Sequence, residues 1–264
     1  MTVNEYIPFL SEIKDVIQHT EIEFTFRMAY QGEVKPGQFF EVSLPKYGEA
    51  PISVSGIGED YVDLTIRKVG KVTNEIFNHY KGQHLFLRGP YGNGFDVANY
   101  EGKELIVVAG GTGLSPVRGV VDYFATDASR SNGFTLITGF KSPEDVLFKA
   151  DLAKWRETSE IILTVDKAEE GYEGHVGLVT KFIPDLPIKN LDDVQVIVVG
   201  PPMMMHFTVQ EFLKRGIAEQ NIWISQERKM CCGIGKCGHC KIDDTYICLE
   251  GPVFNYTKGK DLID

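Results

Sequence analysis

The sequence has no cysteine over most of its length, because all five cysteines lie between Cys231 and Cys248. A disulfide framework would scatter cysteines along the chain, so this clustering argues against one and suits a reducing compartment. The sequence also has no apolar run long enough to cross a bilayer. Its first residues carry neither the basic region nor the apolar core of a signal peptide, and we therefore expect a cytoplasmic protein without a membrane partner.

Positive charge is scarce: 27 Lys and Arg residues stand against 37 Asp and Glu residues, which gives a formal net charge of -10. A surface that binds nucleic acid needs a basic stripe, so we expect no nucleic-acid partner. Repeats and low-complexity tracts are absent as well. With 264 residues and 43% hydrophobic content, the chain is large enough for two domains and a cysteine-rich tail.

The first part of the chain has the pattern of short β-strands. Residues 21–28 and 61–67 alternate polar and apolar side chains, which is typical of half-buried strands. Shorter strand-like runs recur at 38–44, 52–55 and 84–87. Glycine-containing turns separate the runs at Pro36-Gly37, Tyr47-Gly48 and Lys81-Gly82. Several short alternating strands predict a small antiparallel barrel that ends near Asn99.

From Lys103 onward the pattern changes to continuous runs of β-branched and other apolar residues. Four such runs are each followed by a segment that can form a helix, at 105–109, 134–138, 161–165 and 196–199. Strands of this kind are typical of a parallel sheet with crossover helices. We therefore predict a β + α/β fold: an antiparallel barrel over residues 1–100, a parallel-sheet nucleotide-binding domain over 101–225 and a cysteine segment over 226–264.

The cysteine segment has the spacing of an iron-sulfur site. The pattern C-x4-C-x2-C with a later cysteine is the one with which plant-type ferredoxins hold a 2Fe-2S cluster, and it is met by Cys232, Cys237, Cys240 and Cys248. Cys231 does not fit, because only Cys232 gives the four-residue spacing. The alternative is a structural zinc site, although zinc ligands usually come as two closely spaced pairs and only one C-x2-C is present here.

The first strand of the predicted parallel sheet ends in a glycine turn followed by a helix start. Glycines allow a ligand to approach the backbone, and the amides at a helix N-terminus favour an anion. Ligands of open α/β sheets bind at this end of the strands. The alternative is an ordinary strand-to-helix turn. We expect the diphosphate of a dinucleotide to bind at Gly110, Gly111, Thr112 and Gly113.

Two further strand ends are candidates for the same dinucleotide. One has a Gly-Pro turn before a helix, and there we expect contacts from Gly200, Pro201 and Met203, although methionines are often core residues. The other ends at Asp166, whose carboxylate can accept hydrogen bonds from the ribose of NAD and would repel the extra phosphate of NADP. A solvated turn aspartate is the alternative there.

In the barrel half, a strand ends in two basic residues, turns at a glycine and leads into a helix with Thr73 as a plausible N-cap. Basic side chains and free amides can cradle a flavin pyrophosphate. The alternative is a capped surface helix with solvated charges. The residues expected to line this second anion site are Ile66, Arg67, Lys68, Val69, Gly70, Val72 and Thr73.

The order of these motifs along the chain resembles the ferredoxin-NADP reductase superfamily. The resemblance is carried by the Gly-x-Val-Thr turn at 70–73, the stretch Leu-Arg-Gly-Pro-Tyr-Gly-Asn-Gly-Phe at 87–95, the turns at 109–113 and 200–204, and the cysteine motif. It covers nearly the whole chain. The iron-sulfur-bearing branch includes electron-transfer subunits of dihydroorotate dehydrogenase and B subunits of anaerobic sulfite reductase. Residues 4–8, 47–56 and 244–256 most resemble the B subunits.

The resemblance implies a flavin, FAD rather than FMN, and it also shows two departures. The flavin motif Arg-x-Tyr-Ser of the superfamily falls on Ala50 to Ser53, so that its arginine and tyrosine are missing here. A cysteine that usually precedes a glycine near the nicotinamide is replaced by Val199. The additional flavin contacts implied by the resemblance are Pro51, Ile52, Ser53 and Val54.

The implied function is electron transfer from NADH through the flavin and the 2Fe-2S cluster, with no catalytic acid, base or nucleophile. The implied partners are a ferredoxin-like iron-sulfur subunit and a sirohaem-containing subunit that reduces sulfite to sulfide. An electron-transfer subunit of dihydroorotate dehydrogenase, or of a cytosolic hydrogenase, is the alternative within the same class. A non-catalytic nucleotide-binding protein with a zinc-stabilised tail is the alternative from a different class.

Overall fold

The computed structural model describes residues 6–79 and 84–262, which divide into two compact units. The first unit combines the N-terminal part up to Phe95 with residues 227–253, and the second combines residues 96–226 with the chain from Phe254 onward. The cysteine segment thus belongs to the same unit as the N-terminal strands, whereas the sequence suggests three consecutive parts. The expected turn at Lys81-Gly82 lies outside the described residues.

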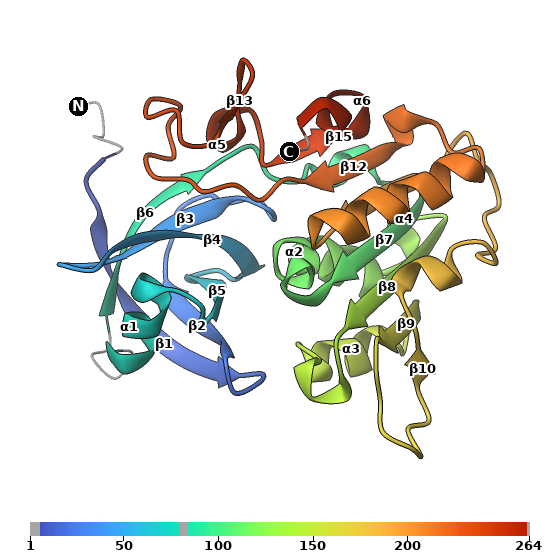
Figure 1. Cartoon of the computed structure of the whole chain (residues 1–264), viewed down its shortest axis with the longest axis horizontal. Helices are drawn as coiled ribbons and strands as arrows, with labels where there is room; N and C mark the ends of the chain where they lie inside the picture. The colour runs from blue at the N-terminus through green and yellow to red at the C-terminus, as the bar shows by residue number, and fades with distance from the viewer. Residues whose placement is uncertain (1–5, 80–83, 263–264) are drawn as a thin grey trace. The chain divides into compact units, whose positions relative to one another are not determined.

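The N-terminal strands form a closed antiparallel barrel, with the order β1-β2-β5-β4-β3-β6 (Figure 1). The predicted barrel is therefore confirmed. Helix α1, Lys71–His79, lies between β5 and β6 in the chain. The barrel strands are β1 (Phe9–Gln18), β2 (Glu23–Ala29), β3 (Phe39–Leu44), β4 (Gly48–Ile57), β5 (Tyr61–Arg67) and β6 (His84–Tyr91).

Alternation along the strands fills the barrel with apolar side chains. In β3, Phe40 and Val42 belong to this core together with residues such as Phe26 and Leu64. The residues between them should be solvated in a one-sided strand, yet Phe39 and Glu41 are also buried. Strand β3 is thus covered on both faces, and contacts described below show that residues of the cysteine segment lie against the neighbouring strand β6.

The second unit is built on a seven-stranded sheet with the order β10-β9-β8-β7-β11-β12-β15. The pairs from β10 to β12 are parallel, which confirms the predicted α/β domain. Its strands are β7 (Glu104–Gly110), β8 (Gly133–Phe140), β9 (Glu160–Val165), β10 (His175–Val176), β11 (Gln195–Val199), β12 (Ile222–Ser225) and β15 (Val253–Asn255). Its helices are α2 (Leu114–Ala125), α3 (Lys149–Trp155), α4 (Pro202–Lys214) and α6 (Tyr256–Gly259).

The cysteine segment has little regular structure. It contains the two-stranded sheet of β13 (Lys241–Ile242) and β14 (Thr245–Tyr246), followed by the short helix α5 (Ile247–Glu250). Elsewhere, single 3₁₀ turns lie at Val97–Asn99, Gly111–Gly113, Ala128–Arg130, Pro143–Asp145, Val179–Phe182, Glu219–Asn221 and Lys260–Leu262.

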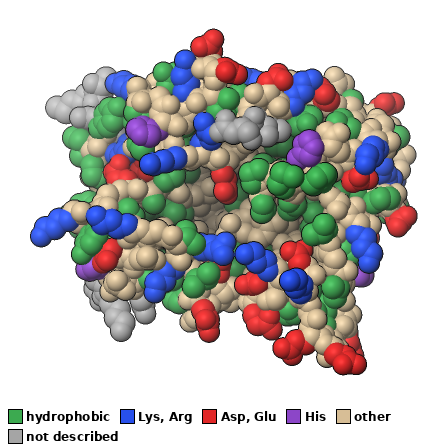
Figure 2. Space-filling model, in the orientation of Figure 1, with side chains coloured by type: hydrophobic (Ala, Val, Ile, Leu, Met, Phe, Trp, Pro, Cys, Tyr) green, Lys and Arg blue, Asp and Glu red, His purple; other side chains and the backbone are tan. Residues whose placement is uncertain are grey.

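The surface carries charges of both signs. Lys and Arg side chains are interspersed with Asp and Glu side chains over the face drawn in Figure 2. Among the described residues, no helix has both the length and the apolar character needed to span a membrane.

Candidate functional site

The glycine turn after β7 lies beside the turn after β11, because the two strands are paired with Val108 opposite Val198. A Cβ atom on Gly113 would lie 2.6 Å from the carbonyl oxygen of Val199, and one on Gly110 would lie 2.3 Å from the sulfur of Met204. Glycine is therefore required at Gly113, where the backbone of the other turn leaves no room for a side chain, whereas at Gly110 the close atom belongs to the flexible side chain of Met204. The structure brings the two predicted dinucleotide turns into contact.

Gly111, at the centre of this turn, has different surroundings. Its φ angle is +55°, and a Cβ atom there would meet no atom within 4 Å. The 3₁₀ turn Gly111–Gly113 leads directly into α2, so backbone amides at the start of this helix face the same region. The partial positive charge at such a helix N-terminus fits the diphosphate of a dinucleotide.

The three methionines that begin α4 have three different environments. Met203 is 64% exposed, Met204 packs over Gly110, and Met205 is buried in the core. The core interpretation is therefore right for Met205, and contact between Met203 and a cofactor stays a prediction. Met203 is placed where a bound ligand could contact it.

Asp166 follows β9, and its backbone N–H donates to the carbonyl of Phe140 at 2.8 Å. Strand β8 lies between β9 and β7, so Asp166 is two strand spacings, about 10 Å, from the strand that carries the glycine turn. Lys141 and Lys167 are joined by a backbone hydrogen bond of 3.1 Å next to it. We therefore expect these two lysines to weaken the repulsion that Asp166 would exert on a ribose phosphate.

The predicted flavin site lies on neighbouring elements of the barrel unit. Strand β4 pairs with β5 and contacts α1, and α1 follows β5 in the chain. Helix α1 begins at Lys71, so Thr73 is its third residue and not its N-cap. The Thr73 hydroxyl accepts from the amides of Val69 at 3.1 Å and Gly70 at 2.9 Å. The amides of the first helical turn are left to bind an anion.

Other residues of this site differ in their availability. Arg67 is paired with Glu23, with an Nε–Oε1 distance of 3.0 Å, and the side chain of Ile66 lies in the barrel core. Lys68 and Val69 are exposed. On β4, the first three predicted residues are partly exposed and the last is buried, namely Pro51, Ile52, Ser53 and Val54. The structure thus brings residues 51–54 and 66–73 together within one unit.

In the cysteine segment, backbone amides point at the sulfur atoms. The amides of Lys236 and Cys237 each lie 3.4 Å from Sγ of Cys232. The amide of Gly235 lies 3.2 Å from Sγ of Cys248, and the amide of Cys248 lies 3.4 Å from Sγ of Cys240. Hydrogen bonds of this kind favour the thiolate form and tune iron-sulfur clusters. The backbone can make them because Gly233, Gly235 and Gly238 adopt positive φ angles.

The four predicted ligands form two pairs, in which the thiol of Cys232 is hydrogen-bonded to Cys237 and that of Cys248 to Cys240. Burial opposes ionisation of Cys232, but the backbone amides of Cys237 and its neighbours lower its pKa to about 6. Burial and the hydrogen bond with Cys240 raise the pKa of Cys248 to about 12. Across the described ranges, no three Cys, His, Asp or Glu side chains are arranged around one ion. Two pairs fit a two-iron cluster, in which each iron takes two protein ligands.

Arg88 is a functional candidate that no sequence signal indicates, because in the sequence it stands out only as part of the resemblance at 87–95. Arg88 is 3% exposed and lies on β6, where it donates to the carbonyl oxygens of Cys231 at 2.9 Å and Cys232 at 2.6 Å. It is also paired with Glu49 of β4, with an Nη2–Oε2 distance of 2.6 Å. The partners lie too far apart in the sequence for any local pattern to indicate them.

Glu41, opposite Arg88 in the pairing of β3 with β6, is completely buried. Neither of its carboxyl oxygens has a hydrogen-bond partner among the described residues. Burial raises the pKa of Glu41 to about 8, although the nearby Arg88 guanidinium lowers it. We therefore expect a neutral carboxyl group beneath the cysteine segment at pH 7.

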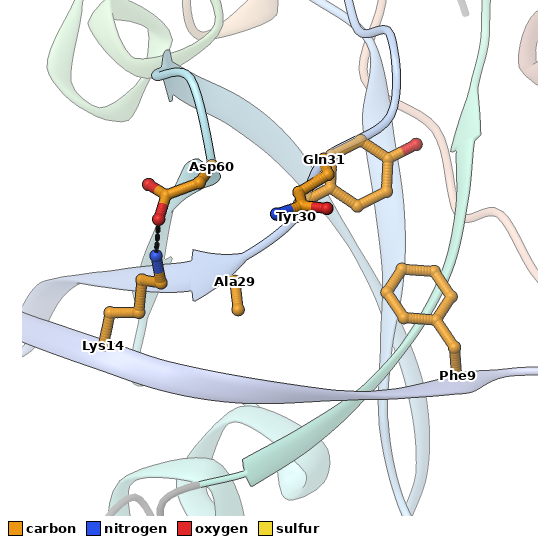
Figure 3. Close-up of a pocket in the computed structure, with 6 residues that line it drawn as sticks. All are labelled: Phe9, Lys14, Ala29, Tyr30, Gln31 and Asp60. Carbon is orange, nitrogen blue, oxygen red and sulfur yellow. Dashed lines mark hydrogen bonds and ion pairs between the residues drawn. The ribbon is translucent and has the colours of Figure 1, made fainter.

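A separate surface depression of about 430 Å³ lies on the barrel (Figure 3). It is lined by the Lys14–Asp60 ion pair and by two aromatic side chains, Phe9 of β1 and Tyr30, which follows β2. None of the residues predicted to bind a cofactor or metal lines it. We therefore do not assign it to the redox site.

Comparisons with known proteins agree with this geometry. The oxidoreductase NAD-binding domain family matches residues 107–210, and the iron-sulfur cluster binding domain of dihydroorotate dehydrogenase B matches residues 227–258. Sulfhydrogenase 1 subunit gamma of Pyrococcus furiosus is 34% identical over 96% of this chain and 92% of its own length. A protein of Thermoplasma volcanium named "Probable dihydroorotate dehydrogenase B (NAD(+)), electron transfer subunit" is 32% identical over 92% of this chain and 88% of its own length.

The fold is shared with solved structures as well. The structure of an NADH-dependent reduced ferredoxin-NADP oxidoreductase has a TM-score of 0.77 with 24% identity, and the match covers 98% of this chain and 91% of that one. A ferredoxin reductase of carbazole 1,9a-dioxygenase has a TM-score of 0.70 with 19% identity over 83% of this chain and 68% of that one.

Together, the fold and the site define an oxidoreductase of the ferredoxin-NADP reductase type with an added iron-sulfur segment. The chain belongs to the family that contains the sulfhydrogenase gamma subunits and the dihydroorotate dehydrogenase B electron transfer subunits. The findings support FAD, an iron-sulfur cluster and NADH as its cofactors. They confirm the ferredoxin-NADP reductase-like fold and the iron-sulfur segment, and they lend no support to the sulfite reductase branch.

Proposed function

We propose that this chain is the electron-entry subunit of a larger oxidoreductase, in which it oxidises NADH and passes electrons one at a time to a partner subunit. The observation that carries this proposal is the combination of two sites in one chain. A glycine turn suited to a dinucleotide diphosphate follows β7, and four cysteines, three of which accept hydrogen bonds from backbone amides at sulfur, lie in a segment attached to the barrel.

A flavin, when bound, exchanges electrons both in pairs and singly, which suits it to stand between a hydride donor and an iron-sulfur cluster. The residues of the chain then have binding and orienting roles. Amides at Gly111 to Gly113 bind the coenzyme diphosphate, and amides at the start of α1, with Lys68, bind the flavin phosphate. Cys232, Cys237, Cys240 and Cys248 bind a 2Fe-2S cluster as thiolates.

For the final acceptor, we favour a hydrogenase-type or dihydroorotate dehydrogenase-type partner. Relatives with these names cover more than nine-tenths of this chain at 34% and 32% identity. Sulfite reduction through a ferredoxin-like subunit and a sirohaem subunit is the second candidate. It is favoured by the resemblance of residues 47–56 and 244–256 to sulfite reductase B subunits.

The test begins with the anaerobically purified, cofactor-loaded chain. NADH should bleach its visible spectrum and sustain reduction of an artificial one-electron acceptor, whereas a zinc protein is colourless and inactive. Capture of partner subunits from the native source, followed by assays with hydrogen, dihydroorotate and sulfite, then identifies the acceptor. A colourless protein that binds zinc would disprove the proposal.

The isolated chain should not reduce sulfite by itself. Every cysteine lies in the segment 231–248, so none remains elsewhere to bind a sirohaem. The assay combines the purified chain, NADH and sulfite without oxygen and measures sulfide. Sustained sulfide production without a partner would contradict the division of labour proposed here.

A further inference from the structure

Arg88 uses all of its hydrogen-bonding capacity within one unit of the structure. A guanidinium group has five N–H donors, and all five donate here. Nε and one Nη2 donor go to Glu49, at 3.2 and 2.6 Å. One Nη1 donor goes to the Tyr91 hydroxyl at 2.9 Å, and the remaining two go to the carbonyl oxygens of Cys231 and Cys232.

The two carbonyl partners belong to the start of the cluster segment. Cys232 is the first ligand in the predicted cluster motif, and its carbonyl oxygen lies 2.6 Å from Nη1 of Arg88 although the two residues are 144 positions apart. The bond is charge-assisted and nearly sealed from solvent, because Arg88 is 3% exposed. The backbone of the first ligand is therefore attached directly to strand β6.

The residues that follow Arg88 hold the remainder of the segment. A Cβ atom on Gly233 would lie 2.5 Å from the Tyr91 ring, so the backbone after Cys232 lies flat against that ring. At the other end, the Asn93 side chain donates to Val253 O at 2.8 Å and accepts from Val253 N at 3.2 Å. Residues 88–93 thus hold the cluster segment near both of its ends.

Glu49 connects this attachment to the predicted flavin site. It lies on β4 two positions before Pro51, and its carboxylate accepts two hydrogen bonds from the Arg88 guanidinium in a bidentate pair. The flat face of the guanidinium is thereby fixed, and with it the direction of the two donors that reach the cysteine carbonyls. A lysine has three donors on a flexible stem and could not hold both carbonyls and the carboxylate in one plane.

We propose that Arg88, oriented by Glu49, is a positioning residue that fixes the Cys232 ligand relative to the flavin-binding barrel. This inference deepens the proposed function and rests on it for the electron-transfer step. The rate of electron transfer falls steeply with distance, so a ligand loop that moves away from the barrel would slow electron transfer to the cluster without affecting NADH binding. Arg88 acts through the backbone of Cys232 and does not itself bind a cofactor.

The test compares Arg88→Lys with Arg27→Lys as the matched control. Arg27 lies on β2 and forms a similar bidentate pair with Asp63, at 2.8 and 3.1 Å, within the same barrel. The measurements are hydrogen–deuterium exchange at residues 231–237, iron content, and stopped-flow rates of flavin and cluster reduction by NADH, with dithionite as a direct reductant.

In Arg88→Lys, we expect exchange at 231–237 to be at least about tenfold faster and NADH-driven cluster reduction to slow by a similar factor. The rate of flavin reduction and the extent of cluster reduction by dithionite should be unchanged, which locates the defect between flavin and cluster. The control should change neither. If Arg88→Lys does not fold, Glu49→Gln serves instead, with the same direction and a smaller effect.

Wild-type exchange and wild-type rates in both Arg88→Lys and Glu49→Gln would overturn the inference. Equal effects in Arg27→Lys would also overturn it, because the loss would then come from general loosening of the barrel. If NADH does not reduce the wild-type cluster, the proposed function fails. The exchange measurement still decides whether Arg88 holds the cluster segment.

Discussion

The glycine turn after β7 and the cysteine segment on the barrel, our two proposed binding sites, are built by different means. In the turn, consecutive residues from Gly110 to Gly113 carry the amides proposed to bind the diphosphate, and the adjacent strand end only restricts side-chain size. In the cysteine segment, the proposed ligands lie within residues 232–248, but distant residues on and just after β6, Arg88 and Asn93, determine where the segment lies. The first site is local in sequence, and the second is completed by tertiary contacts.

This difference explains the surroundings of the two sites. The turn needs small residues where backbones meet, and nothing there is buried and charged. Against the cysteine segment, by contrast, lie a buried arginine with all donors used and a buried carboxyl group with no partner among the described residues. Changes at the second site should therefore alter electrostatics as well as packing.

The largest expected effect concerns the cluster ligands. Serine in place of Cys232, Cys237, Cys240 or Cys248 should abolish or severely destabilise the 2Fe-2S cluster, since each removes a thiolate ligand. Cys231→Ser should keep the cluster, because only the backbone carbonyl of Cys231 is used by Arg88. Iron content and the visible spectrum measure both. Loss of the cluster in Cys231→Ser with retention in Cys232→Ser would show that the ligand register is wrong.

The second effect concerns Glu41 and pH. The pKa of Glu41 is raised to about 8 by burial from an ordinary value of 4.5, so the folded state holds a proton that the unfolded state has lost between these values. Stability should therefore fall as pH rises through this window, by on the order of 3 kcal/mol between pH 5 and 7.

Glu41→Gln, which stays neutral, should remove this pH dependence and be the more stable protein at pH 7. Urea denaturation of both proteins at several pH values measures the effect. The opposite result would be a wild-type stability that rises with pH over this range and equals that of the variant only at acidic pH. That result would mean that the carboxyl group is ionised in the folded protein.

The third effect separates the two glycines of the turn. Gly113→Ala would place a methyl group 2.6 Å from the Val199 carbonyl oxygen, and we expect a loss of about 2 to 3 kcal/mol in the free energy of unfolding. Gly111→Ala meets no neighbouring atom but keeps a φ angle of +55°, which costs about 1 kcal/mol. Denaturant titration of the two variants should give this order, and the reverse order would contradict the packing described for the turn.

The smallest effect concerns coenzyme choice. The protein should prefer NADH, and Asp166→Ser should narrow its preference over NADPH by no more than about tenfold, or ~1.4 kcal/mol. The effect is small because Lys141 and Lys167 lie beside Asp166 in the backbone hydrogen-bond pattern. Dye-reduction kinetics with both coenzymes provide the measurement. Equal use of the two coenzymes by the wild-type protein would remove Asp166 from the ribose site.

Some elements of the sites could be read from the sequence and others could not. The glycine turn and the cysteine spacing were recognisable because hydrogen-bond geometry and metal ligation depend on neighbouring residues. Thr73 was expected to cap α1, yet the helix starts at Lys71, two residues before Thr73. The Thr73 hydroxyl accepts hydrogen bonds from the amides of Val69 and Gly70. Sequence patterns predict the presence of a helix more accurately than the residues at which it begins and ends.

By itself, the sequence determined the barrel, the parallel sheet, the glycine turn and the ligand spacing, because alternation, apolar runs and short motifs act over a few residues. Only the tertiary structure decided that the cysteine segment belongs to the barrel unit, that Glu41 is buried beneath it, and that Arg88 holds Cys232. The physical reason is that burial and charge pairing depend on which distant segments meet. Strand periodicity indicates that Glu41 and Arg88 both point to the outer face of the barrel, but it does not indicate which segment covers that face.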